Sequence, residues 1–186
     1  MPRNADPARR RLREATLNLV EQRGFENTTA AEIAAKAGVT ERTFFRHFPD
    51  KREALFDGED AFRADLAQAV VLAPEALAPM DTLLHAFRSV VPVVERNRPF
   101  TERRQRMIAS TPALQERVML KTATLTAAIA DALVERGADR SSAALASQVG
   151  MAAFAEAIRT WFAESRSELD THLLRAFDLL QRLTRA

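Results

Sequence analysis

Hydrophobic residues recur along the chain at intervals of three and four positions, the spacing that predicts amphipathic α-helices. The first helix is expected to begin at Asp6-Pro7, a cap residue followed by a proline suited to the first helical position. Gly24 is expected to end this helix. Its apolar face contains Leu12, Ala15, Leu19 and Val20.

Two short helices are expected next, each with its own start signal. Thr29 and Glu32 have the spacing of a capping box, in which each residue satisfies a backbone N–H of the other. Thr40 is expected to cap the following helix, which runs to about His47 or Phe48. After Pro49, a longer helix is expected to start at the cap residue Asp50. Its apolar stripe contains Leu55, Phe62, Leu66 and Val70.

The remainder of the chain also has helical spacing. A segment rich in helix breakers, from Ala73 to Pro79, separates it from the preceding helix. Pro92 is expected to kink or split the next helix, because proline removes a backbone hydrogen bond. Helices are expected at about 81–97, 99–110, 112–136, 140–164 and 168–185.

No stretch of useful length alternates between apolar and polar residues as a strand would, so the chain is predicted to be all-α. We expect an N-terminal three-helix bundle in residues 1–56 and a larger helical domain in residues 57–186. The long helix after Asp50 is expected to act as a strut shared by both.

The two short helices have the features of a helix-turn-helix. Ala34 and Ala37 are small enough for close helix approach, Gly38 permits the turn, and Val39 fills the junction. Phe44 and Phe48 are expected to point inward, against Leu19 and Phe25. The residues left on the outside are Thr40, Arg42, Thr43, Phe45, Arg46 and His47.

This outward face has the chemistry of a DNA reader. Hydroxyls and helix N-termini suit phosphate oxygens, and Arg42 and Arg46 suit guanine edges or phosphates. Lys51 is a natural phosphate contact. His47 either contacts phosphate or packs at the helix end.

Composition narrows the classes of protein. The chain has 186 residues and no cysteine, which excludes disulfides and cysteine zinc sites. No apolar stretch is long enough to span a membrane, and the N-terminus lacks the apolar core of a signal peptide. A soluble cytoplasmic protein is therefore expected. Residues 1–56 contain eleven basic and eight acidic residues, a net charge of +3. The rest of the chain contains sixteen basic and seventeen acidic residues, a net charge of −1. The basic residues at the start, which either touch phosphates or form a solvated face, are Arg3, Arg9, Arg10, Arg11 and Arg13.

The spacing of these residues is similar to the N-terminal signature of the TetR family of transcriptional regulators, over about residues 9–56. The residues that match are Gly24-Phe25, Thr28-Thr29, Ile33-Ala34, Ala37-Gly38-Val39, Thr43-Phe44-Phe45, Phe48 and Lys51. The resemblance implies a nine-helix, homodimeric, ligand-responsive repressor that binds a pseudo-palindromic DNA operator. It further implies that the third helix reads DNA, that the last two helices form the dimer, and that the C-terminal domain binds a small effector.

Residue by residue, the resemblance implies that Thr29 and Thr40 contact phosphates at helix starts, that Thr43 and Phe45 face DNA, and that Lys51 binds phosphate. The chain departs from the family pattern at two positions. Position 42 is often glycine and here is arginine, and position 45 is usually tyrosine and here is phenylalanine. The operator preference is therefore not expected to match that of a relative.

The C-terminal region has no pattern of an active site. His85 and His172 stand alone, and there is no phosphate-binding loop or nucleophile elbow, so neither an enzyme nor a cofactor or metal is expected. Two alternatives stay open: a helical small-molecule binding protein without operator function, and an activator that uses the same head.

The last two expected helices each have a stripe of small or apolar residues. These stripes are expected either to form a dimer interface or to face only the chain's own core. One contains Ala143, Ala144, Ala146, Ser147, Gly150, Ala152, Ala153 and Ala157, and the other Leu169, Leu173, Ala176, Phe177, Leu180 and Leu183. The residues expected either to line a cavity for a largely apolar effector or to be ordinary core are Phe87, Val91, Phe100, Met107, Met119 and Leu125. The basic run Arg103, Arg104 and Arg106 is expected to hold an anionic ligand group or to form a solvated face.

Overall fold

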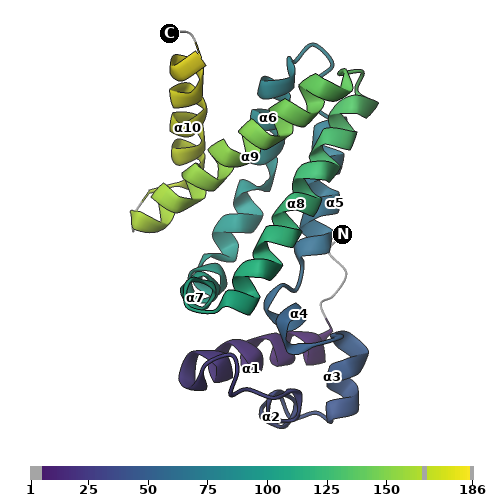
Figure 1. Cartoon of the computed structure of the whole chain (residues 1–186), viewed down its shortest axis with the longest axis vertical. Coiled ribbons are helices and arrows are strands. Elements are labelled where there is room, and N and C mark those ends of the chain that lie inside the picture. The colour runs from purple at the N-terminus through teal and green to yellow at the C-terminus, as the bar shows by residue number, and fades with distance from the viewer. Residues whose placement is uncertain (1–5, 165–166, 185–186) are drawn as a thin grey trace. The chain divides into compact units, whose positions relative to one another are not determined.

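A computed structural model describes residues 6–164 and 167–184. Within these ranges all regular structure is helical, which confirms the predicted all-α class, and no helix there is long and apolar enough to cross a membrane (Figure 1). The helices are α1 (Pro7–Arg23), α2 (Ala30–Lys36), α3 (Glu41–His47), α4 (Lys51–Leu55), α5 (Glu59–Val71), α6 (Pro79–Arg96), α7 (Arg98–Ala109), α8 (Pro112–Glu135), α9 (Arg140–Ala163) and α10 (Leu169–Thr184).

The predicted long helix after Asp50 is wrong. The chain instead forms α4 and α5, separated by the turn Phe56–Gly58, so the described residues hold ten helices where nine were expected. Gly58 has a φ of +91°, a conformation that glycine adopts readily and other residues do not. Phe56 is 2% exposed, and burial of its ring favours the turn. The apolar spacing gave no sign of this break, because the buried residues on both sides of it keep helical spacing: Leu55 in α4, and Leu66 and Val70 in α5.

The structure divides into two compact units. The first contains the described residues up to Glu59 together with Pro99–Met119, and the second contains Asp60–Arg98 and the described residues from Leu120 onward. Residues 99–119 thus pack with the N-terminal helices, which the sequence did not indicate.

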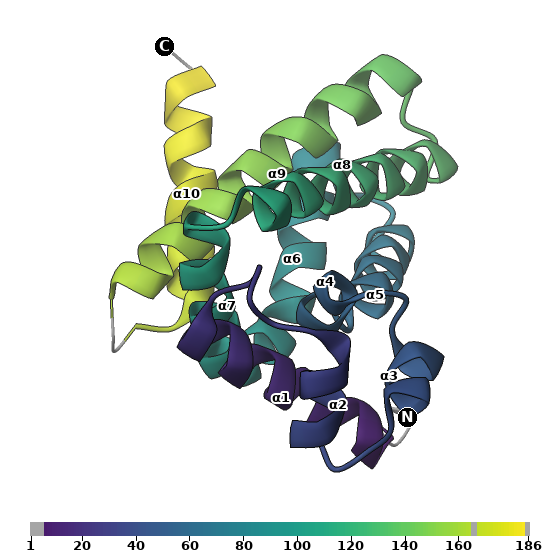
Figure 2. The same cartoon turned by 60° about the horizontal axis from the view of Figure 1, so that its bottom comes forward.

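The first unit has two apolar clusters. Leu19, Phe44 and Phe48 belong to one of them, as predicted. Most residues of this cluster come from α1, α2 and α3, which lie side by side in Figure 2. Phe25 lies in the other, where it meets residues of α1, α4, α7 and α8, so its predicted packing against Phe44 and Phe48 is wrong. The buried members of this second cluster are Leu17, Val20, Phe25, Leu55, Phe56, Met107, Ile108 and Leu114.

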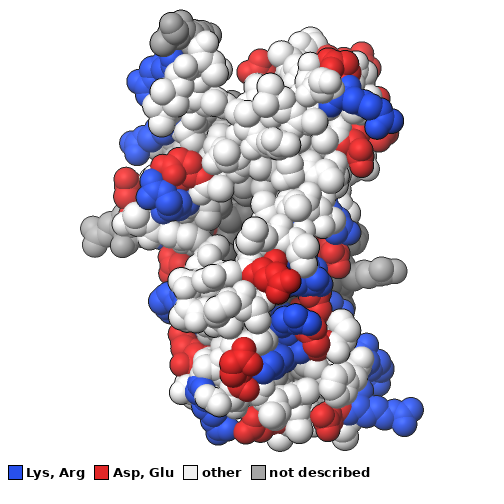
Figure 3. Space-filling model, in the orientation of Figure 1, with Lys and Arg blue, Asp and Glu red and all other residues white. Residues whose placement is uncertain are grey.

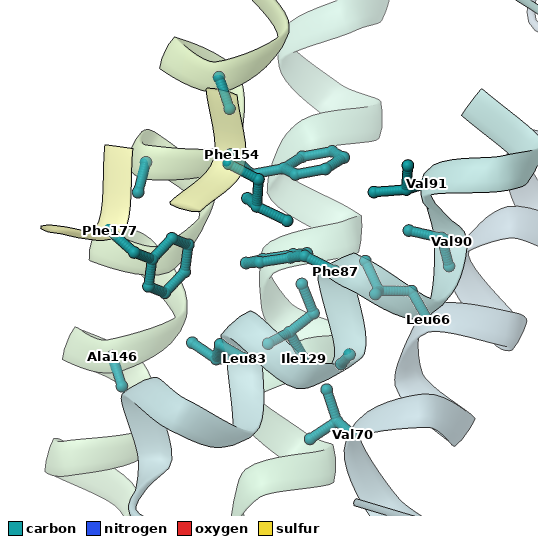
Figure 4. Packing of buried hydrophobic residues seen from close by; sticks show 14 of the residues in the cluster. Leu66, Val70, Leu83, Phe87, Val90, Val91, Ile129, Ala146, Phe154 and Phe177 are labelled. Atoms are coloured by element: carbon teal, nitrogen blue, oxygen red, sulfur yellow. The ribbon is translucent and has the colours of Figure 1, made fainter. Parts of the chain in front are cut away.

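The second unit is built around three aromatic rings from α6, α9 and α10 (Figure 4). Phe87 stacks on Phe154 with ring centroids 4.7 Å apart and an interplanar angle of 15°. Phe177 meets Phe87 edge-on, at 6.1 Å. Both arrangements are favourable aromatic geometries, which add to the burial of the rings.

Gly150 makes the close crossing of α6 and α9 possible. A Cβ atom at this position would lie 2.6 Å from Cδ1 of Leu83, a distance that real Cβ atoms do not adopt. The small-residue stripe of α9 therefore faces, in large part, the chain's own core. Its buried members are Ala143, Ala146, Ser147, Gly150, Ala153 and Ala157. On α6, the helix continues through Pro92, so the predicted split does not occur.

Arginine side chains hold the carbonyl groups that helices leave without partners at their C-terminal ends. Arg136 donates to the carbonyl oxygens of Val71 (3.0 Å), Ala73 (2.6 Å) and Pro74 (2.8 Å), just after α5. Arg98 donates to the carbonyl oxygen of Trp161 at 3.1 Å and lies 4.3 Å from the centroid of its ring. These contacts fix the ends of α5 and α9 within the second unit.

Candidate nucleic-acid interface

Helix α3 presents a polar and aromatic face that is open to solvent. Thr40 begins the helix: its hydroxyl accepts from the backbone N–H of Thr43 at 3.2 Å and lies 3.0 Å from the Thr43 hydroxyl. Phe44 is fully buried and anchors the helix, whereas the side chain of Phe45 is 53% exposed. The two rings meet edge-on at 5.3 Å. An exposed phenyl group held in this way suits apolar contact with a thymine methyl.

A hollow of about 420 Å³ lies beside the start of α3, lined by Thr40, Arg42, Thr43 and Arg46. Within the described part of the chain, neither Arg42 nor Arg46 forms an ion pair or hydrogen bond, and both are exposed. Figure 3 shows basic side chains projecting over the α3 region of the first unit. Two unpaired guanidinium groups beside two hydroxyls are suited to phosphate oxygens and to guanine edges.

The start of α2 has the predicted capping box. The Thr29 hydroxyl accepts from the Glu32 backbone N–H at 3.2 Å, and the Glu32 carboxylate accepts from the Thr29 backbone N–H at 3.0 Å and from its hydroxyl at 2.9 Å. These Thr29 groups, followed by Arg23 at 2.8 Å, hold the pKa of Glu32 below its usual range. Thr29 is exposed, but its hydroxyl already serves Glu32.

Lys51 is engaged by the protein itself. Its ammonium group donates to the carbonyl oxygens of Phe25 at 2.7 Å and Thr28 at 3.0 Å. Because an ammonium group has three donors, one is left for another partner. The side chain therefore connects the start of α4 to the loop between α1 and α2.

The side chain of His47 is only 10% exposed, and its Nε2 atom lies 3.5 Å from a carboxylate oxygen of Asp6. Asp6 also caps α1 by accepting from the Ala8 backbone N–H at 2.9 Å. This placement favours packing at the helix end over phosphate contact.

Sequence reasoning missed two arginines that position the reading helices. Arg11 donates to the carbonyl oxygen of Ala37, in the turn between α2 and α3, at 3.0 Å. Arg9 forms an ion pair with Asp57 at 2.7 Å and lies 4.9 Å from the centroid of the Phe48 ring. Both belong to the basic run at the start of the chain. Their spacing along α1 was the only feature of the sequence that could have indicated these contacts. Arg3, of the same run, lies outside the described residues.

The six candidate ligand residues are divided between the two units. Phe87 and Val91 are buried in the second unit, with Leu125 packed against the same cluster. Met107 is buried in the first unit, with Phe100 packed against its cluster. Met119 is 72% exposed.

Arg103 and Arg104 of α7 were expected to hold an anionic ligand group or to form a solvated face, but both instead pair with side chains of the protein. Arg103 donates to the carboxylate of Glu21 at 2.7 Å and to the side-chain oxygen of Asn18 at 2.6 Å, both on α1. Arg104 donates to the carboxylate of Glu59 at 2.7 Å. Arg106 is the most exposed, at 65%.

His172 is not isolated, contrary to expectation. It is 2% exposed, and its ring nitrogens lie 2.6 Å from the Ser167 hydroxyl and 2.9 Å from the Thr160 hydroxyl. The Glu164 carboxylate lies 3.5 Å away. The histidine therefore connects α10 to the end of α9.

The two parts of the chain resemble known families separately. Residues 12–57 match the family described as bacterial regulatory proteins, tetR family, and residues 77–184 match the MftR C-terminal domain. The fold and the helix-turn-helix define a DNA-binding transcriptional regulator rather than an enzyme. The chain belongs to the TetR family.

Individual relatives agree with this assignment. The chain is 36% identical over 80 residues to the HTH-type transcriptional regulator TcmR of Streptomyces glaucescens, covering 43% of this chain and 35% of that protein. It is 35% identical over 65 residues to the uncharacterized regulator YvkB of Bacillus subtilis (strain 168), covering 33% of this chain and 34% of that protein. The matches thus span about a third of these two relatives.

A solved structure matches nearly the whole chain. It is the Thermus thermophilus FadR, a TetR-family transcriptional repressor, in complex with lauroyl-CoA. The identity is 26%, the TM-score is 0.59, and the match covers 93% of each chain.

Proposed function

We propose that this regulator is a homodimeric repressor that binds a pseudo-palindromic operator and is released by a small molecule. The observation that carries the proposal is the outward face of α3, where Arg42 and Arg46 are exposed and without ion pairs in the described structure beside Thr40 and Thr43. An arginine that is not neutralised by its own protein is available to a phosphate or a base.

The candidate DNA residues divide into two roles. Arg42, Thr43, Phe45 and Arg46 contact bases or phosphates in the major groove, with Thr40 at the helix start. Thr29, His47 and Lys51 hold the helices in register through the protein contacts described above, and the free third donor of Lys51 reaches a phosphate only secondarily.

The dimer forms through α9 and α10. Several large apolar side chains of these helices are exposed in the single chain: Leu145, Leu174, Leu179 and Leu183. An apolar surface of this kind typically marks an interface. In a dimer, the two α3 helices would enter successive major grooves about 34–36 Å apart, so the operator would be a pseudo-palindrome.

The effector is a molecule with an apolar chain. Phe87 and Val91 belong to the apolar cluster of the second unit, and the partly buried Leu125 and Met151 pack against it. Methionine adapts to varied ligand shapes. The lauroyl-CoA complex of the Thermus relative, at 26% identity, supports an acyl chain as the first compound to test.

A gel shift on DNA from upstream of the protein's own coding region tests the proposal. The proposal predicts a complex that weakens steeply with salt and dissociates with lauroyl-CoA, while reporter repression in cells separates repressor from activator. Effector binding without any salt-dependent affinity for DNA would instead support the alternative, a small-molecule binding protein without operator function.

A further inference from the structure

The outward face of α3 carries the two arginines of this helix along its middle. Phe44 is fully buried and marks the inward side. An α-helix turns by about 100° and rises by about 1.5 Å per residue, so Arg42 and Arg46 each lie about 160° from Phe44 around the axis. They are about 40° apart around the axis and about 6 Å apart along it. Both side chains are exposed and line the same hollow. The middle of a recognition helix meets the floor of the major groove, where the base edges lie.

The two flanks of this face differ in chemistry. Phe45 lies on one flank, about 60° from Arg42 around the axis, and is 53% exposed. Glu41, four residues earlier, is exposed on the same flank. A carboxylate is repelled by phosphates, and a phenyl ring forms no hydrogen bond with them. On the opposite flank, Thr43 carries a hydroxyl, which suits a phosphate oxygen. The flank with Phe45 is therefore suited to base edges, and the flank with Thr43 to the sugar–phosphate backbone.

These side chains select among the bases by their chemistry. A guanidinium group matches the two acceptors of guanine, O6 and N7, and thymine is the base with a methyl group in the major groove. Adenine is matched in the same bidentate way by Asn or Gln, and residues 40–47 contain neither. Base pairs are spaced by about 3.4 Å, so two arginines about 6 Å apart along the helix suit base pairs that lie two steps apart.

We propose that each half of the operator contains two G·C pairs two steps apart with an A·T pair between them. Arg42 and Arg46 each bind one guanine, and Phe45 contacts the thymine methyl of the middle pair. Phe45 is the specificity-determining residue for that pair, because a phenyl ring rewards the methyl group and forms no hydrogen bond with a base edge. The inference rests on the proposed function and names the DNA that the proposed interface reads.

Selection from a library of random DNA duplexes tests the base pattern first. Duplexes bound by the parent protein are recovered and sequenced through several rounds. We expect the recovered half-sites to share the triplet of G·C, A·T and G·C pairs. Enrichment of half-sites without this triplet would overturn the inference and leave the proposed function standing. Failure to enrich any sequence, together with no salt-dependent binding of DNA, would overturn the proposed function itself.

Single-atom changes in a selected duplex then assign each contact to a residue. Replacing one guanine by 7-deazaguanine removes the N7 acceptor and should weaken binding by the parent at least about fivefold. Replacing the middle thymine by uracil removes only the methyl group and should weaken binding about fourfold. Arg42→Ala should lose sensitivity to one guanine and Arg46→Ala to the other, while both keep the uracil effect. Phe45→Ala should lose only the uracil effect, and Phe45→Leu, which keeps an apolar side chain, should retain it.

The variants serve as controls for one another. Lys36→Ala removes an exposed cation from α2 in the same unit and should keep all three sensitivities. Circular dichroism reports whether each variant keeps its helix content. Equal uracil effects in the parent and in Phe45→Ala would overturn the role of Phe45, and unchanged guanine sensitivity in Arg42→Ala and Arg46→Ala would overturn theirs. Absence of a uracil effect in the parent would overturn the methyl contact without any variant.

Discussion

Lys51 contacts Phe25, in the loop that leads into the helix-turn-helix, through both its carbonyl group and its ring. Its ammonium nitrogen lies 2.7 Å from the Phe25 carbonyl oxygen and 4.2 Å from the centroid of the Phe25 ring. The side chain thus serves the backbone of its own protein, although the family resemblance points to a phosphate contact. The two roles predict different salt dependences, because each lost phosphate contact lowers the slope of log affinity against log salt.

We predict that Lys51→Met lowers the melting temperature and weakens operator binding while leaving the salt slope unchanged. The loop carbonyls of Phe25 and Thr28 lose their donor, so Thr29 is less well positioned. Titrations of operator DNA at several salt concentrations measure the slope. A slope reduced by about 0.9 with unchanged stability would assign Lys51 to phosphate contact instead.

We predict that Gly150→Ala destabilises the protein. Alanine improves helix propensity by about 1 kcal/mol, but overpacking a core typically costs about 1–3 kcal/mol. The added Cβ would lie 2.6 Å from Cδ1 of Leu83, which is fully buried and has little room to move. Denaturant unfolding of Gly150→Ala and of Gly150→Ala with Leu83→Val measures the effect. The second variant should recover stability, and a more stable single variant would show that α6 and α9 do not cross this closely.

The first unit should lose stability in acid. Hydrogen bonds from Arg103 lower the pKa of Glu21, and those from Thr29 lower the pKa of Glu32. Burial alone would raise the pKa of Asp50, but hydrogen bonds from Arg52 and backbone N–H groups lower it overall. Since these pKa values are lower in the folded state, the unfolded chain takes up protons first as the pH falls.

The contribution of these carboxylates is therefore complete above their ordinary pKa of about 4 and is lost progressively below it. Melting temperatures between about pH 7 and pH 3 measure this loss. Glu21→Gln should give a shallower decline below about pH 4 than the parent protein, and a decline of equal steepness would show that the Arg103–Glu21 contact is absent in solution.

A charged residue introduced on the exposed face of α10 should dissociate the proposed dimer. Leu174 and Leu179 are 42% and 45% exposed in the single chain, and burial of a charge without a partner is costly. Light scattering should show that Leu174→Glu is a folded monomer with weak operator affinity. Leu72→Glu, at a position 73% exposed on the turn after α5, is the matched control and should stay a dimer. A dimeric Leu174→Glu would place the interface elsewhere.

Local signals in the sequence predicted most of the helices correctly. The caps expected at Asp6, Thr29, Thr40 and Asp50 all accept backbone hydrogen bonds as predicted. These interactions join residues only a few positions apart, so spacing alone specifies them. The break at Gly58 was missed because its signal, one glycine, competed with an uninterrupted apolar stripe.

Contacts between distant residues were beyond sequence reasoning. Arg103 and Arg104 pair with Glu21 and Glu59, which lie 82 and 45 residues away, and nothing in the local pattern of α7 identifies these partners. The same holds for Lys51 and Arg11, which donate to backbone carbonyls 26 residues away. Phe44, by contrast, was placed correctly because helical periodicity alone turns it inward.

In the proposed function the face of α3 reads an operator, and one titration tests this role most directly. Fluorescence anisotropy of labelled upstream DNA is measured with the parent protein, Arg42→Ala, Arg46→Ala and the control Arg106→Ala. The account predicts salt-dependent binding by the parent and the control, and weakening of about 1–3 kcal/mol for a variant that loses a base contact. Equal affinity of all four proteins, or no salt-dependent binding by the parent, would contradict it.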